Sequence, residues 1–128
     1  MATLTQLAVR SRGALDSLLV LHAQLLFSRN RWVGLCVLIG VCSVPRYALL
    51  GGVALLGASL AARGLGIGNG ALYTPYGYSS LWVGYGIAHA YALDAVSAAF
   101  ALASGGLCAL LAATLTALVS YFGWLPVL

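Results

Sequence analysis

The sequence has no lysine and no glutamate, and it carries few charges of any kind. Its charged side chains are six arginines and two aspartates among 128 residues, which is 6% of the chain. A water-soluble domain has about 25% charged residues. Hydrophobic residues make up 62% of this chain, so a fold built from it could not present an ordinary solvated surface. The composition predicts an integral membrane protein.

The same scarcity excludes several classes of function. The net charge is +4, but the arginines stand singly or in pairs at the edges of apolar runs, where they would anchor at lipid headgroups. No nucleic-acid partner is therefore expected. The three cysteines lie within apolar runs without metal-ligand spacing. The chain shows no paired carboxylates and no nucleophile beside a base, so we expect no catalysis, no metal and no cofactor.

The first apolar segment is too short to span a bilayer. The run from Leu15 to Leu26 would rise about 18 Å as a helix, against a hydrocarbon core of about 30 Å. Gln24 lies in this run and Phe27 directly follows it, three residues further on and thus on the same face of a helix. A half-length apolar helix with an amide and an aromatic side chain predicts a re-entrant pore helix over residues 14–28.

Four further helices are predicted to span the membrane, so that residues 1–128 form one all-α membrane domain. Proline favours the first turn of a helix, so Pro45 should begin the second of these helices, and Asp94 should cap the last of them. Glycines in the second helix, Gly51, Gly52 and Gly57, favour close helix packing. The predicted spans cover residues 32–44, 46–62, 76–93 and 95–122.

Three stretches, in order, are similar to motifs of one family. The first matches a Gln-x-x-Phe pore-helix motif with a downstream Asn and Gly, at Gln24, Phe27, Asn30 and Gly34. The second is similar to Tyr-Gly-Tyr-Asn-x-x-Leu-x-Gly and contains Tyr78, Ser79 and Gly84, with serine in place of the asparagine. The third, residues 125–128, is similar to the start of Leu-Pro-x-x-Thr-x-Pro-Phe. Together they resemble the urea transporter family.

The resemblance implies part of one half of an inverted-repeat urea channel of the bacterial inner membrane. Each half of such a channel has a re-entrant helix, four spans and a half-span, so this chain would be incomplete. The implied function is passive passage of urea or a similar small amide. The resemblance implies that Gln24 and Phe27 line the path, and that other matched residues support it through helix contacts: Asn30, Gly34, Tyr78, Ser79 and Gly84.

A second hypothesis is that the chain is a non-transporting subunit of a larger membrane complex, and that this subunit is derived from the urea-transporter fold. The sequence stops before Thr-x-Pro-Phe and has serine at position 79, which favours this alternative, whereas the intact Gln24 and Phe27 pair favours transport. Gln24 could also form a hydrogen bond between helices, and Phe27 could pack in a core. Under either hypothesis the expected partners are the lipid bilayer and further copies or subunits.

Overall fold

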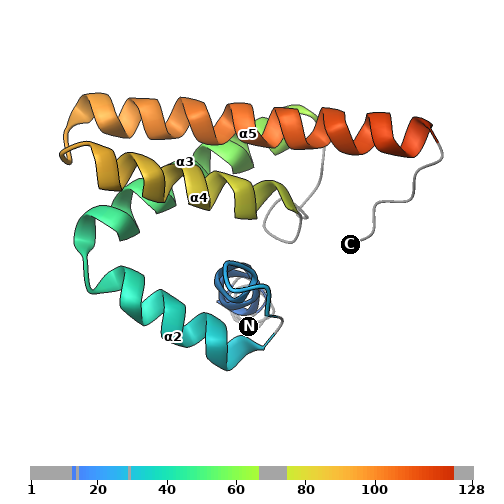
Figure 1. Ribbon diagram of the computed structural model, residues 1–128. Helices are drawn as coiled ribbons and strands as arrows, with labels where there is room; N and C mark the ends of the chain where they lie inside the picture. The colour runs from blue at the N-terminus through green and yellow to red at the C-terminus, as the bar shows by residue number, and fades with distance from the viewer. Residues whose placement is uncertain (1–12, 14, 29, 67–74, 123–128) are drawn as a thin grey trace, which may run out of the picture. The chain divides into compact units, whose positions relative to one another are not determined.

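The computed structural model describes residues 13, 15–28, 30–66 and 75–122, and every regular element in these ranges is an α-helix (Figure 1). The chain, predicted as a single membrane domain, divides into two compact units, residues 1–45 and 46–128. The third family-like stretch, residues 125–128, lies outside the described residues. Each unit is described by itself.

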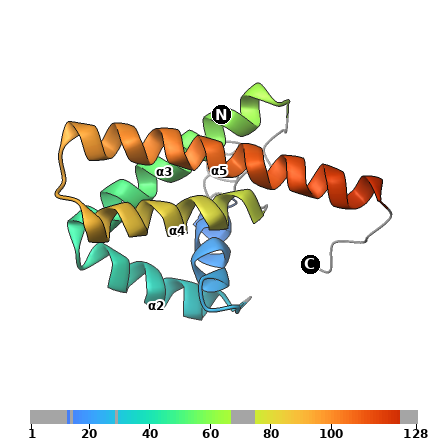
Figure 2. The ribbon, with the colours of Figure 1, turned by 45° about the horizontal axis from the view of Figure 1, so that its top comes forward.

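The first unit holds the N-terminal helix, whose described residues are 13 and 15–24, and α2, Arg31–Cys42. The two helices cross closely at Gly34 (Figure 2). A Cβ at this position would overlap the backbone of Leu19, so only glycine permits the contact. The side chain of Asn30 caps α2 by accepting a 3.0 Å hydrogen bond from the backbone N–H of Trp32.

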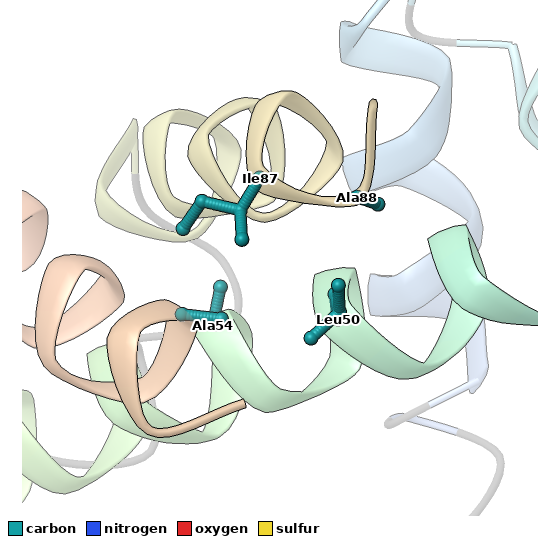
Figure 3. Packing of buried hydrophobic residues seen from close by; sticks show 5 residues of the cluster. Leu50, Ala54, Ile87 and Ala88 are labelled. Carbon is teal, nitrogen blue, oxygen red and sulfur yellow. The ribbon is translucent and has the colours of Figure 1, made fainter. Parts of the chain in front are cut away.

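The second unit consists of α3 (Pro45–Gly64), α4 (Pro75–Ala90) and α5 (Ala95–Tyr121). As predicted, Pro45 begins α3. Helices α4 and α5 run antiparallel side by side, joined by a short connection (Figures 1 and 2). The core lies between α3 and α4 and reaches the first turns of α5 (Figure 3), and its buried side chains are Leu50, Ala54, Ile87, Ala88 and Ala101.

Small residues set the distance between the helices of the second unit. A Cβ on Gly105 of α5 would overlap the backbone of Ala54 in α3, and one on Gly57 of α3 would overlap the backbone of Leu102. Gly84 of α4 likewise lies against the backbone of Gly51. Close backbone approach through glycine is typical of helix packing in membranes, where water supplies no hydrophobic driving force between helices.

Two of the described helices are long and apolar enough to cross a membrane, α3 with 20 residues and α5 with 27. A buried core helix of a soluble protein would meet the same criterion, but only 11% of the most apolar window of α5 is buried. Its hydroxyl groups donate to carbonyl groups of the same helix, from Thr114, Thr116 and Ser120. Exposed leucines and internally satisfied hydroxyls are what a hydrocarbon environment favours.

The other two predicted spans are shorter than a bilayer. Helix α2 has 12 residues and α4 has 16, which correspond to about 18 Å and about 24 Å. The observed ends differ from the predicted bounds by at most three residues. The structure therefore supports an all-α protein with two candidate spans, whereas the sequence predicted four.

Asp94 caps α5, as predicted. Its carboxylate accepts a 2.6 Å hydrogen bond from the backbone N–H of Ser97, and the Ser97 hydroxyl lies 3.0 Å from the backbone N–H of Asp94. This reciprocal arrangement is a capping box. The hydrogen bond from the Ser97 N–H lowers the pKa of the Asp94 carboxyl below its ordinary value.

Replacing Asp94 by alanine should lower the melting temperature of the protein above about pH 5. The ionised carboxylate stabilises the fold above the ordinary pKa of an aspartate, and this contribution is lost as the pH falls through the lowered pKa of the folded state. The difference in melting temperature between wild type and Asp94→Ala should therefore shrink below about pH 4. Thermal unfolding followed by circular dichroism measures it, and a difference that does not depend on pH would contradict the assigned cap.

Candidate functional site

The candidate site is the turn that ends the N-terminal helix. The backbone N–H of Phe27 donates to the carbonyl of Gln24 at 2.9 Å, and that of Ser28 donates to the carbonyl of Ala23 at 3.0 Å. Phe27 has a φ angle of 53°. This pair of hydrogen bonds around a left-handed residue is a Schellman motif, which ends a helix and turns the chain away from its axis. Asn30 and α2 follow directly.

The structure corrects the expected arrangement of Gln24 and Phe27. The helix ends at Gln24, not at residue 28, so Phe27 is not one helical turn further along the same face. Gln24 is half-buried at the last helical position, whereas Phe27 is 92% exposed in the turn. From Leu25 on, the backbone N–H groups donate to carbonyls three residues back, and the left-handed backbone at Phe27 then turns the chain away from the helix.

A phenylalanine at this position is unusual, because the left-handed conformation favours glycine and costs an L residue about 1 kcal/mol or more. The exposed ring of Phe27 recovers little of that cost through packing. A strained conformation of an exposed side chain is a reason to suspect function. We therefore retain the exposed ring of Phe27 as part of the candidate site.

Phe27→Gly should stabilise the first unit, by about 0.5–1 kcal/mol, because glycine adopts the observed φ without steric cost. If the ring has a functional role, the same substitution should lower activity while it raises stability. Unfolding of the purified variant in detergent measures the first effect. Phe27→Asn is the control, since asparagine also tolerates this conformation. Lower stability in both variants would mean that the ring packs against something.

Asn30 and Gly34, matched to the family motif by sequence, have structural roles in the same unit. Asn30 caps α2, and Gly34 lets α2 cross the N-terminal helix. Arg31 also joins the two helices, through an exposed ion pair of 3.4 Å with Asp16. Exposed pairs contribute little to stability in water, but within a membrane each charge would need such a partner.

His22 is buried in the N-terminal helix two residues before Gln24. Its Nδ1 lies 2.7 Å from the backbone carbonyl of Leu18, one turn earlier. A neutral imidazole in this arrangement donates its proton to the carbonyl. His22 is therefore hydrogen-bonded within its own helix.

Tyr78, Ser79 and Gly84 lie on α4 in the second unit. Tyr78 and Ser79 are half-buried, and Gly84 packs against α3. The neighbouring Ser80, which the sequence did not single out, is fully buried and donates a 3.0 Å hydrogen bond to the carbonyl of Gly105 in α5. Its signal in the sequence was a polar pair within an apolar helix, since such residues bond across helices in membranes.

No family model matches the chain, and neither a curated protein nor a solved structure matches it. Among the residues that the structure describes, no group of three histidine, cysteine or acidic side chains could hold a metal ion.

Proposed function

We propose that the chain is part of a membrane channel or facilitator that lets a small neutral amide such as urea pass down its gradient. In this proposal the N-terminal helix and the following turn form a re-entrant element, Gln24 offers its amide oxygen to the solute, and Phe27 supplies an apolar wall. The solute path is completed by protein outside the first unit.

The observation that carries the proposal is the turn that ends the N-terminal helix. The described residues 15–24 of this helix rise about 15 Å before the turn, half the thickness of the hydrocarbon core. The Schellman turn then redirects the chain, and α2 begins again at Arg31. Non-helical backbone at membrane depth is tolerated where it lines a cavity or is covered by protein, and the turn has its own hydrogen bonds at 2.9–3.0 Å.

The chemistry of the solute fits this element. Urea is planar and neutral, with four N–H donors and one carbonyl acceptor, so a selective path needs acceptors for the donors and flat apolar walls. An uncharged amide such as Gln24 can accept one N–H without the cost of a buried charge. Pore width and lining hydrogen-bond groups are the general basis of such selectivity.

The second candidate function is a non-transporting subunit of a larger membrane complex. The exposed apolar surface of α5 favours it, because a helix with so little intramolecular cover has much area left for a neighbour. The large exposed side chains in the C-terminal half of α5 include Leu107, Leu111, Leu115, Leu118 and Tyr121.

Urea flux into proteoliposomes separates the two candidates. The full-length protein is reconstituted into vesicles, and the vesicles are mixed rapidly with a urea solution. The change in vesicle volume as urea enters is followed by light scattering. The channel proposal predicts faster urea entry than into protein-free vesicles, with unchanged entry of glycerol. Urea entry equal to that of protein-free vesicles would leave the subunit as the remaining candidate.

A further inference from the structure

One end of the second unit gathers polar and aromatic side chains that the transport proposal does not use. The first turn of α3, the last turns of α4 and the start of α5 meet at this end (Figures 1 and 2). The side chains in contact there, called the Arg46 cluster below, are Arg46, Tyr47, Tyr85 and His89.

Contacts within the cluster hold the guanidinium group of Arg46 in place. Its Cζ lies 5.3 Å from the centre of the Tyr47 ring, within the range of a cation–π interaction. The Tyr47 ring also packs edge-on against Tyr85, at 6.3 Å between centroids. Because these contacts already restrict the side chain of Arg46, less conformational entropy of this side chain is lost when a ligand binds to its guanidinium group.

Tyr47 and His89 add a hydrogen-bond donor. The Tyr47 hydroxyl lies 3.1 Å from Nδ1 of His89. If the hydroxyl donates, the imidazole keeps Nε2–H as a donor, and if Nδ1–H donates, the hydroxyl keeps its own proton. In either tautomer, one N–H or O–H group of this pair is not used in the Tyr47–His89 hydrogen bond. This donor lies near the positive charge of Arg46.

Arg46 has no ion-pair partner among the residues that the structure describes. The ion pair in the described ranges joins Arg31 to Asp16. Asp94 lies at the same end of the second unit, but its carboxylate accepts from the first turn of α5. The cluster therefore combines a guanidinium without an ion-pair partner in the described ranges with a further hydrogen-bond donor. Together these two groups complement an anion with several acceptor oxygens.

We propose that the Arg46 cluster binds the phosphate of an anionic phospholipid headgroup. The cluster lies at the start of α3, which is one of the two described helices long and apolar enough to span a membrane. Arginine matches phosphate with a planar fork of donors, and tyrosines are favoured at the headgroup level. This proposal rests on the membrane location of the second unit and not on transport, so it stands or falls separately from urea flux.

The test measures lipid binding to the full-length protein in detergent by native mass spectrometry. Phosphatidylglycerol and phosphatidylcholine of the same acyl chains are added separately and in competition. We expect wild type to prefer phosphatidylglycerol, and Arg46→Gln to lower that affinity about fivefold. Arg63→Gln is the matched control, since Arg63 ends the same helix and is also exposed, and it should keep the affinity of wild type.

Equal losses in Arg46→Gln and Arg63→Gln would overturn the proposal, because binding would then follow net charge. Inorganic phosphate that displaces the lipid at millimolar concentration would also overturn it, in favour of a site for free phosphate. If Arg46→Gln fails to fold, Arg46→Lys keeps the charge without the planar fork. A lipid preference reduced at least twofold in that variant would support the proposal, and an unchanged preference would contradict it.

Discussion

Gly105→Ala should destabilise the second unit strongly, while Gly106→Ala, one residue later, should be neutral or stabilising. The added Cβ at position 105 would lie 2.8 Å from Cα of Ala54 and closer still to its carbonyl group. These are backbone atoms of α3 and cannot move aside as a flexible side chain can, so α3 and α5 must separate. Overpacking of this kind costs about 1–3 kcal/mol.

Gly105 also accepts a buried hydrogen bond from α4, and a shift of α5 at this position would strain that bond. Ser80 donates to the carbonyl of Gly105 at 3.0 Å, and both residues are buried. Weakening of this hydrogen bond would add to the cost of overpacking, and a loss of a few kcal/mol is a large fraction of the stability of a small protein. We expect little folded protein after this substitution.

Gly106 provides the matched control because the nearest atom to a Cβ at that position is 3.5 Å away, an ordinary contact. Alanine there gains helix propensity of up to about 1 kcal/mol over glycine. Unfolding of both variants in detergent, followed by circular dichroism, gives the comparison. Equal effects at positions 105 and 106 would contradict the close crossing of α3 and α5.

Gln24→Leu should reduce urea flux about tenfold in proteoliposomes without loss of folded protein. Leucine fits the half-buried end of the N-terminal helix but offers no acceptor, so one N–H group of the solute loses its partner as it passes. An unpaired polar group in a dehydrated site costs about 1–3 kcal/mol, and 1.4 kcal/mol corresponds to a factor of ten in rate.

The control for Gln24→Leu is Thr114→Val, which removes a hydroxyl from the exposed side of α5 at nearly constant volume. Its flux should equal that of wild type. If Gln24→Leu keeps full flux at equal protein content, Gln24 does not contact the solute, and a hydrogen bond between helices becomes its better assignment. If Gln24→Leu lowers stability as much as flux, the role is structural.

Local signals in the sequence predicted much of the fold. Pro45 and Asp94 were placed correctly at the starts of α3 and α5, because a proline and a capping carboxylate act through the adjacent backbone. The faces of the helices could not be predicted in the same way, since apolar residues surround each helix. Of the neighbouring glycines in α3, Gly51 contacts α4 whereas Gly52 lies in open space.

The end of the N-terminal helix was the main structural feature that the sequence did not indicate. A left-handed residue at a helix end is expected to be glycine or asparagine, and the asparagine of this segment, Asn30, caps α2 instead. Phe27 therefore looked like a continuation of the helix. Because Gln24 ends the helix and Phe27 lies in the turn, the two side chains do not share one helix face. Their roles are therefore tested separately.

The most direct test of the account is the depth of position 27 in the bilayer. The native cysteines are replaced, and a nitroxide label is attached to Phe27→Cys, with labels at Leu56→Cys near the middle of α3 and Tyr91→Cys in the connection before α5 as references. A re-entrant turn predicts a depth between those two, inside the hydrocarbon region. A label at position 27 that is as accessible to water as the label at position 91 would contradict the account.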